Sequence, residues 1–301
     1  MAAGGVGGYF GARLAAAGGD VHFIARGAHL EAIRQNGLKL ESPLGDLHIK
    51  DAQATDDPAT VGVADVVLFA VKLWDSEAAA KACTALIGPD TIFVTFQNGI
   101  DGVSRLTPIL GAKSVVGGVT HISSFIGQPG TIRHNGDFAR LQFGEADGGA
   151  SPRLAAFLAA CEGAGIEAKI SPDIELAQWQ KFVFLVGLSG ATGVTRQSIG
   201  PILADSDCRQ MLINLMEETA AVARARGIAL AADFAHDRLA YAEALPAHMK
   251  ASMLNDLQQG KRLELDWLSG EVVRLGRQLA IPTPTNDAIY AALKPLRGGA
   301  A

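Results

Sequence analysis

The sequence predicts an α/β domain with a doubly wound parallel sheet, followed by a second domain made only of helices. Up to about residue 170, short apolar runs typical of buried strands alternate with segments of helical period. After Pro172 apolar residues recur at helical spacing, and no convincing strand pattern follows. We therefore expect one domain over residues 1–170 and an all-helical domain over residues 171–301.

Helices and strands of the first domain are predicted from the period of their apolar residues. Val6, Phe10 and Leu14 lie on one helical face, and Gly18-Gly19 ends that helix. The remaining elements, in chain order, are a strand at 21–26, a strand at 64–71, a helix at 75–87, a strand at 91–96, several short strands within 114–145, a helix at 152–163 and a strand at 166–170.

The second domain is predicted to contain helices only. Recognisable stops separate them, such as Gly227, Gly260 and Pro282. The predicted helices are 173–190, 205–226, 231–244, 247–259, 262–279 and 284–294.

Composition narrows the class of protein. The chain has 301 residues, a net charge of −5 and no apolar run long enough to span a membrane, so neither a nucleic-acid partner nor a membrane is expected. Cys83, Cys161 and Cys208 are far apart, which argues against a disulfide framework or a metal site. With no secretory leader in the sequence, we expect a cytoplasmic protein.

A glycine-rich turn opens the chain. Gly4, Gly5, Val6 and Gly7 lie at the start of the first predicted helix, as in the G-x-G-x-x-G fingerprint of Rossmann-type domains, where helix N–H groups bind a pyrophosphate. Ala2 takes the place of the first glycine. The strand that normally precedes the loop is absent from the sequence, so we expect the true N-terminus to be missing, through a start-site error or a truncation. The alternative is a flexible glycine-rich terminus without function.

Three side chains follow predicted strands, where ligands of such domains bind. Arg26 stands where NAD enzymes carry an acid for the ribose hydroxyl, and an arginine there favours the 2′-phosphate of NADP. The alternative is a solvent-exposed arginine. Lys72 and Asn98 end two neighbouring buried strands, although Asn98-Gly99 could equally be turn chemistry.

Lys181 is the most informative residue of the second domain. It lies in a predicted helix that is apolar almost all round, so its ammonium must reach water, an acid or a substrate. Glu264 and Asp266 lie in a late helix of similar character. A buried Lys181–Glu264 pair could hold an ammonium as a general acid. The alternative is a lysine that extends to solvent.

Six motifs, in this order and spacing, resemble those of the ketopantoate reductase (2-dehydropantoate 2-reductase) family over nearly the whole chain. The resemblance implies NADPH-dependent reduction of a 2-oxo acid to a 2-hydroxy acid, in that family ketopantoate to pantoate in pantothenate biosynthesis. The motifs are residues 4–11, Ala70-Val71-Lys72, Gln97-Asn98-Gly99, residues 179–182, residues 252–256 and residues 264–270.

The resemblance also implies roles for single residues. Lys181 resembles the proton donor, Glu264 the acid near the cofactor and the lysine, and Ser252 a contact of the substrate carboxylate. Asn98 resembles an asparagine that touches cofactor and substrate. Lys72 and the backbone of Ile122 resemble groups beside the cofactor.

Two positions depart from the family pattern. One and two turns after the catalytic lysine, the family has asparagines that face the substrate, and here these positions are Leu185 and Ser189. A site that loses buried polar partners usually changes substrate.

We expect an NADP-dependent enzyme that binds a small 2-oxo acid and can form a homodimer. The alternatives are a dehydrogenase of another hydroxy acid and a nucleotide-binding paralogue without catalysis.

Overall fold

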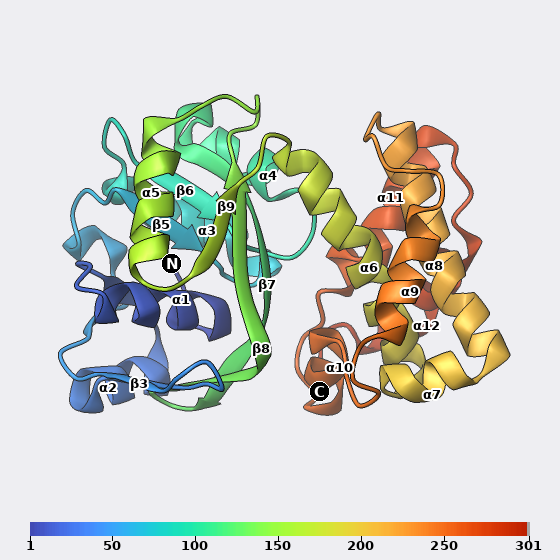
Figure 1. Ribbon diagram of the computed structural model, residues 1–301, viewed down its shortest axis with the longest axis horizontal. Helices are drawn as coiled ribbons and strands as arrows, with labels where there is room; N and C mark the ends of the chain where they lie inside the picture. The colour runs from blue at the N-terminus through green and yellow to red at the C-terminus, as the bar shows by residue number, and fades with distance from the viewer. Residues whose placement is uncertain (300–301) are drawn as a thin grey trace. The chain divides into compact units, whose positions relative to one another are not determined.

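The computed structural model describes residues 1–299, which fold as two compact units, Met1–Ala177 and a second unit that begins at Gln178. The first unit contains every strand found in the described residues, and the second consists of helices (Figure 1). An α/β unit followed by an all-α unit is the fold class that the sequence predicts.

The first unit is built on a mixed sheet in the order β3-β2-β8-β7-β6-β5, with β9 paired to β8. Beside it, β1 and β4 form a parallel pair. The pairs β5–β6 and β6–β7 are parallel, as expected for strands that alternate with helices. The strands are β1 His22–Ile24, β2 Leu38–Glu41, β3 Leu47–Ile49, β4 Gln53–Thr55, β5 Val66–Phe69, β6 Ile92–Thr95, β7 Val115–Gln128, β8 Thr131–Gly144 and β9 Glu167–Ile170.

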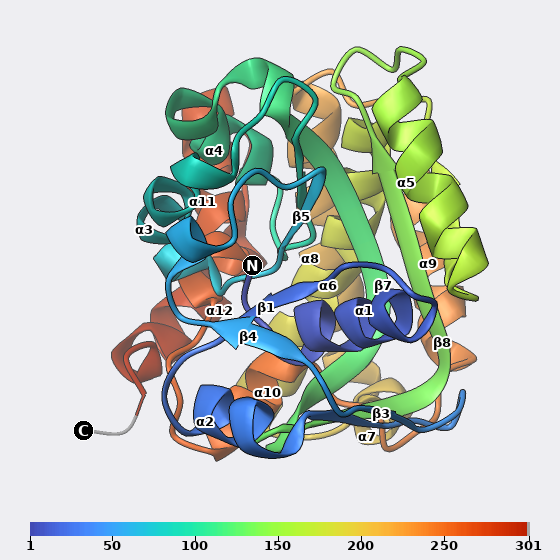
Figure 2. The same ribbon diagram turned by 90° about the vertical axis from the view of Figure 1, so that its left-hand side faces the viewer.

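Helices cover both faces of this sheet, and β6 shows why. Its side chains alternate between two buried clusters: Ile92 and Val94 pack in the cluster that includes α1 and α5, and Phe93 in the cluster that includes α3 and α4. Figure 2 shows α1 and α5 on one side and α3 and α4 on the other. The helices are α1 Gly5–Ala16, α2 Gly27–Asn36, α3 Ser76–Ala82, α4 Gly102–Leu110 and α5 Pro152–Gly163, with short 3-10 turns that include Leu73–Asp75.

The first three residues bridge β1 and β5. The Met1 ammonium donates to the Leu68 carbonyl and the Met1 carbonyl accepts from Ala70, while the N–H of Ala3 donates to Ile24. This is the place that a central first strand occupies in a doubly wound sheet, and here it holds residues 1–3 without an assigned strand.

Residues 114–145 differ from the sequence prediction of several short strands, which is wrong. They form one long hairpin of two 14-residue strands, β7 and β8. The chain reverses only at Pro129-Gly130, where Gly130 has a φ of +76°. The apparent turn at His134-Asn135-Gly136 lies inside β8, and a register shift in the ladder beside Ile122 absorbs the extra residues.

The second unit matches most predicted helices, with three corrections. The single helix predicted at 262–279 is wrong: a 3-10 turn, Leu265–Trp267, precedes α11, and Leu268 with φ −107° and ψ −106° separates them. The helix predicted at 247–259 is shorter, and a short helix after Ser198 was not predicted. The helices are α6 Ile174–Thr195, α7 Ile199–Ala204, α8 Ser206–Ala225, α9 Phe234–Glu243, α10 Ser252–Gln258, α11 Ser269–Leu279 and α12 Pro284–Leu293.

Small residues allow the helices of this unit to pack closely. A Cβ atom on Gly187 of α6 would lie 2.5 Å from the Met216 side chain of α8, so the two helices meet at van der Waals distance only because this residue is glycine.

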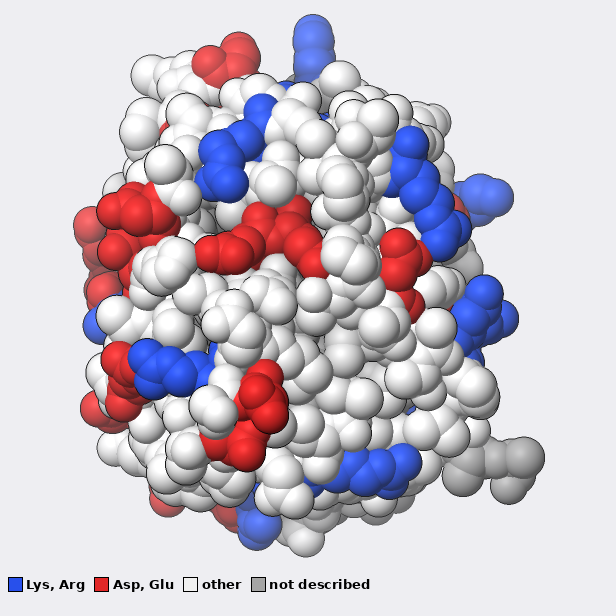
Figure 3. Space-filling view, turned by 90° about the vertical axis from the view of Figure 1, so that its right-hand side faces the viewer, with Lys and Arg blue, Asp and Glu red and all other residues white. Residues whose placement is uncertain are grey.

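Within residues 1–299, none of the helices has both the length and the apolar character of a membrane span. On the face drawn in Figure 3, acidic and basic side chains both occur with uncharged surface between them.

Candidate active site

The glycine loop ends at a helix N-terminus that is open to an anion. Gly4 is the N-cap residue of α1, no side chain caps the helix, and its first turn carries no acid. A Cβ atom on Gly4 would meet nothing within 4 Å. The first N–H groups of α1 and the positive end of the helix dipole are therefore left without a capping side chain, as a phosphate-binding helix requires.

Two glycines of the loop are required by close backbone contacts. A Cβ atom on Gly5 would lie 2.1 Å from the carbonyl oxygen of Ser124, and one on Gly7 would lie 2.1 Å from that of Ala2. Ala2 itself has a φ of +66°, in the left-handed region that favours glycine. At the first position of the fingerprint, the backbone therefore has a conformation that glycine adopts without strain. These glycine positions fit the pyrophosphate of a dinucleotide cofactor.

Arg26 extends its side chain into solvent at the start of α2. It is the N-cap residue of that helix, and its side chain is 78% exposed. One guanidinium nitrogen lies 3.6 Å from the Asp75 carboxylate, an ion pair too exposed to hold the side chain firmly. The guanidinium is therefore able to meet a second anion.

Lys72 and Asn98 lie on loops that follow β5 and β6. Lys72 is exposed, and its Nζ lies 5.6 Å from the centre of the Trp74 ring. Asn98 is half-buried and precedes Gly99, whose φ of +88° turns the chain. Parallel neighbouring strands bring these two loops to the same edge of the sheet.

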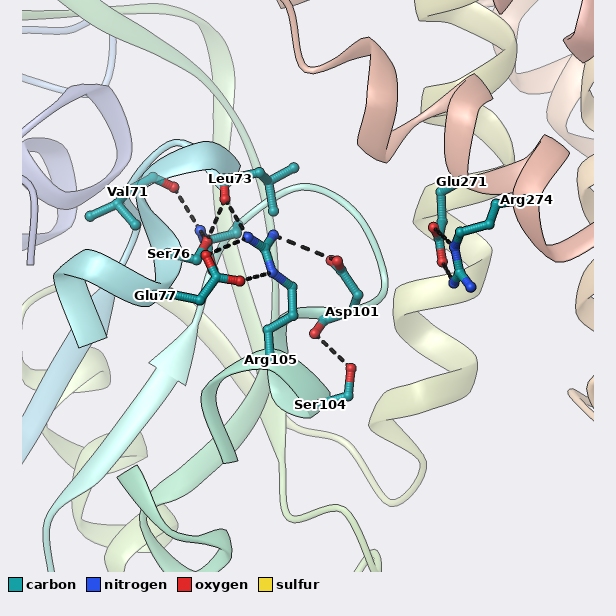
Figure 4. A network of polar contacts seen from close by, with 10 residues as sticks. Val71, Leu73, Ser76, Glu77, Asp101, Ser104, Arg105, Glu271 and Arg274 are labelled. Atoms are coloured by element: carbon teal, nitrogen blue, oxygen red, sulfur yellow. Dashed lines mark hydrogen bonds and ion pairs between the residues drawn. The ribbon is translucent and has the colours of Figure 1, made fainter. Parts of the chain in front are cut away.

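A polar network fixes these loops, and the sequence analysis did not identify it (Figure 4). The Gln97 side chain donates to the Val71 carbonyl at 2.9 Å and to the Ser76 hydroxyl at 2.8 Å, so it ties the end of β6 to the end of β5. Gln97 lies within the Gln97-Asn98-Gly99 motif, and its place after a buried strand is the one signal that could have revealed this role.

Arg105 of α4 joins the same network through the Leu73 carbonyl and Glu77. It donates to both carboxylate oxygens of Glu77, at 2.8 and 2.9 Å, and to the Leu73 carbonyl at 2.8 Å. The hydrogen bond from Arg105 is the largest cause that lowers the pKa of Glu77. The groups to which Arg105 donates these hydrogen bonds lie about thirty residues away, so the local sequence pattern does not reveal them. Its ion pair with Asp101, at 3.6 Å, lies within one helical turn.

Ile122 lies at the irregularity in the ladder between β7 and β8. The ladder pairs His121 with Arg140 and then Ser123 with Asn135, and Ile122 falls between them. Bulges of this kind redirect the backbone and are common beside active sites. Ser124, two residues later, is the residue whose carbonyl contacts Gly5, so this part of β7 adjoins the glycine loop.

Lys181 and Glu264 interact within the second unit. Lys181 is half-buried on α6, and Glu264, 6% exposed, directly precedes the 3-10 turn before α11. Burial lowers the pKa of Lys181 to about 8, and the charge of Glu264 opposes that shift. The prediction that Glu264 is helical is wrong, because the chain enters α11 only at Ser269.

Asp266, the other acid of this segment, has different partners. It accepts a hydrogen bond from the Tyr290 hydroxyl at 2.8 Å and lies 3.8 Å from Arg297. Glu264 is thus the acid of this segment whose charge acts on Lys181.

Leu185 and Ser189 follow Lys181 at one and two turns on α6, so all three share a helix face. Leu185 is half-buried. Ser189 is 1% exposed, and its hydroxyl has no hydrogen-bond partner within residues 1–299. Ser252 is exposed at the first position of α10.

Comparison with known proteins identifies the family of this chain. Residues 2–148 match the family model described as Ketopantoate reductase PanE/ApbA, and residues 173–297 match the model of its C-terminal domain. The chain is 31% identical to the 2-dehydropantoate 2-reductase of Mesorhizobium japonicum, with 98% of this chain and 95% of that protein covered.

Solved structures have the same fold. The crystal structure of 2-dehydropantoate 2-reductase from Geobacter metallireducens matches with a TM-score of 0.92 at 29% identity, over 98% of both chains. The ternary structure of D-mandelate dehydrogenase with NADH and anilino(oxo)acetate shares the fold, with a TM-score of 0.89 at 20% identity, over 98% of this chain and 96% of that one. Both halves of the sequence and the fold thus agree that this chain belongs to the ketopantoate reductase family of oxidoreductases.

Proposed function

We propose that this protein reduces a 2-oxo acid to a 2-hydroxy acid with NADPH, in the manner of 2-dehydropantoate 2-reductases. One observation carries the proposal: in a chain of this family, Lys181 has a pKa of about 8 and a buried acid, Glu264, whose charge supports its protonated form. A general acid works best when its pKa lies near the working pH.

Most of the residues that we propose to hold the cofactor belong to the first unit. Its pyrophosphate would bind at the open N-terminus of α1, and Arg26 would bind the 2′-phosphate that distinguishes NADPH from NADH. When bound, the cofactor supplies the hydride for the reduction. The residues that we propose to hold it are Gly4, Gly5, Val6, Gly7, Arg26, Lys72, Asn98, the backbone of Ile122, and Glu264.

Lys181 would stabilise and protonate the substrate oxygen. As the carbonyl carbon is reduced, its oxygen gains negative charge, and an ammonium held beside it lowers the energy of that state. The proton then passes from Nζ to the oxygen. A positioned general acid of this kind contributes on the order of 10²–10⁴-fold to the rate. Glu264 would keep the lysine protonated before the step and balance its charge.

The substrate would be a 2-oxo acid with a more apolar tail than ketopantoate. Asn98, Lys181 and Ser252 are proposed to contact its polar end. Leu185 offers an apolar surface one turn from Lys181, where a buried polar partner would be needed to recognise a hydroxyl group. Pockets built from apolar side chains favour apolar groups by about 1–3 kcal/mol per methylene.

An NADPH-oxidation assay against a panel of 2-oxo acids tests the proposal. The panel contains ketopantoate and 2-oxo acids of equal charge with alkyl or aryl tails. We expect the highest kcat/KM for a member with an apolar tail. The substrate assignment fails if ketopantoate gives the highest value, and the proposed reaction fails if no member accelerates NADPH oxidation.

A second candidate is the reverse reaction, oxidation of a 2-hydroxy acid. The pKa of Lys181 near 8 favours this candidate, because a neutral amine can then form at mildly alkaline pH and accept the hydroxyl proton. Initial rates of the oxidation across pH test this candidate: kcat/KM for the 2-hydroxy acid should rise as pH rises through about 8, where Lys181 loses its proton. A rate that does not rise with pH would contradict it.

A further inference from the structure

His29 connects the glycine loop to the turn of the long hairpin. It is the third residue of α2, and its ring is half-buried. Its Nε2 lies 2.8 Å from the Ala3 carbonyl oxygen, and its Nδ1 lies 3.0 Å from the backbone nitrogen of Gly130. The two bonds join segments that are 26 and 101 residues away in the sequence.

These contacts define the tautomer of the ring. A backbone N–H can only donate, so Nδ1 of His29 must accept the hydrogen bond from Gly130. The proton of the neutral ring is then on Nε2, where it is donated to the Ala3 carbonyl. Each nitrogen has a distinct role, and no other common side chain supplies a donor and an acceptor at these two positions.

Ala3 is the residue on which this contact acts. It directly precedes Gly4, and its peptide groups are held on both sides: the N–H donates to Ile24 at 2.8 Å and the carbonyl accepts from His29. The carbonyl also lies 3.2 Å from the position of a Cβ atom on Gly8. The orientation of the Ala3–Gly4 peptide therefore depends on the His29 ring.

The hairpin meets the loop at a second point. The Ser124 carbonyl of β7 lies against Gly5, close enough to exclude any side chain there. His29 and Ser124 thus hold the loop against the same hairpin, and the residues that they contact, Ala3 and Gly5, lie on either side of Gly4. A loop fixed in this way binds a ligand without the cost of ordering its backbone.

We propose that His29 is a positioning residue for cofactor binding, which acts through the Ala3 carbonyl and the Gly130 turn and does not itself touch the cofactor. The inference rests on the proposed function, because it takes the glycine loop to bind the pyrophosphate of NADPH. It assigns to the hairpin turn a role in orienting that loop.

Three variants separate the two hydrogen bonds. In His29→Gln, the side-chain N–H₂ can reach the Ala3 carbonyl. In His29→Asn, the shorter amide oxygen can accept from Gly130 but its N–H₂ does not reach Ala3. His29→Leu removes both bonds. The measurements are the Kd for NADPH by fluorescence titration, the KM for each substrate, kcat, and the melting temperature.

We expect His29→Asn and His29→Leu to weaken NADPH binding by about tenfold or more, the size of one lost hydrogen bond plus loop disorder. His29→Gln should stay within about threefold of wild type. At saturating NADPH, kcat and the KM for the 2-oxo acid should change little in all three. A merely structural role would lower stability without this selective effect on the cofactor.

His134 provides a matched control in the same unit. Its ring is 3% exposed and bonded at both nitrogens, to the Ser42 hydroxyl at 2.9 Å and the Phe138 carbonyl at 3.0 Å, and neither partner belongs to the glycine loop. His134→Leu should lower the melting temperature as much as His29→Leu but leave the Kd for NADPH within about threefold.

Two results would overturn the inference: an unchanged Kd for NADPH in His29→Asn, or an equal loss of affinity in His134→Leu. A wild-type protein that binds neither NADPH nor NADH would instead refute the proposed function and the inference together. A protein that binds NADPH but reduces no 2-oxo acid would refute only the proposed reaction.

Discussion

The charge of Glu264 raises the pKa of Lys181, in opposition to burial, and the balance leaves that pKa at about 8. Burial and the Glu264 carboxylate affect the lysine in different ways. Burial removes water from the ammonium and makes it a stronger acid, while the carboxylate keeps the ammonium protonated near neutral pH. A lysine in this state can give up a proton during a reaction and recover it afterwards.

The first prediction concerns the pH dependence of the reduction. A lowered pKa means that Lys181 is protonated below about pH 8 and loses its proton above it, so kcat/KM should fall as pH rises through about 8. In Glu264→Gln the support for the ammonium is lost, and the fall should move to lower pH. Asp266→Asn is the control, because Asp266 bonds to Tyr290 instead. A profile that is the same in Glu264→Gln and wild type would contradict the pairing.

The second prediction concerns the choice of cofactor. Arg26 is exposed and has one weak ion-pair partner, so a 2′-phosphate should bind it by charge-assisted hydrogen bonds. NADPH should bind about tenfold or more tightly than NADH, and Arg26→Ala should remove most of the difference. Arg34→Ala, on the same helix, is the control and should leave it unchanged. Equal affinities for the two cofactors in wild type would refute the assignment to NADP.

The third prediction concerns the packing of the glycine loop. Gly7→Ala places a Cβ atom 2.1 Å from the Ala2 carbonyl, so the loop must move, and NADPH affinity and thermal stability should both fall sharply. Gly163→Ala, at the end of α5, is the matched control, because a Cβ atom there meets nothing within 4 Å. It should be neutral or stabilise by up to about 1 kcal/mol. Similar melting temperatures for the two variants would show that the contact at Gly7 is not tight.

The fourth prediction concerns stability in acid. Burial lowers the pKa of both His29 and His134 from 6.5, so in the folded protein each stays neutral at a pH where the unfolded chain is already protonated. Their contribution is complete above about pH 6.5 and is lost as pH falls below it. Denaturant unfolding followed from about pH 7.5 to 5 should show falling stability, with a shallower slope in the double variant His29→Gln, His134→Gln. An unchanged slope would mean that these rings do not cause the effect.

Much of the fold follows from local pattern. The pattern of apolar residues predicts the buried strands at 66–69 and 92–95, and it predicts most helices of the second unit. The sequence does not predict the long hairpin, because Asn135-Gly136 is a typical turn sequence. In the structure these residues lie inside β8, where the register shift opposite Ile122 accommodates them. The helical spacing of its segment predicts a helix at Glu264, although the chain enters α11 only after Leu268.

The candidate site was predicted only in part, and the reason is distance along the chain. Residues in motifs, such as Gly7 and Lys181, can be found by type and spacing. The side chains that hold these motifs in place cannot be found in this way. Gln97 reaches Val71, Arg105 reaches Leu73 and His29 reaches Gly130, over 26, 32 and 101 residues. Such contacts exist only once the chain has folded.

The kinetics of Lys181→Ala test the central claim most directly. The protein is compared with wild type and with Lys261→Ala, an exposed lysine of the same unit, using NADPH and the best 2-oxo acid of the panel. The account predicts a folded protein that still binds NADPH but whose kcat is lower by on the order of 10²-fold or more, while Lys261→Ala behaves as wild type. A kcat for Lys181→Ala within about threefold of wild type would contradict the account.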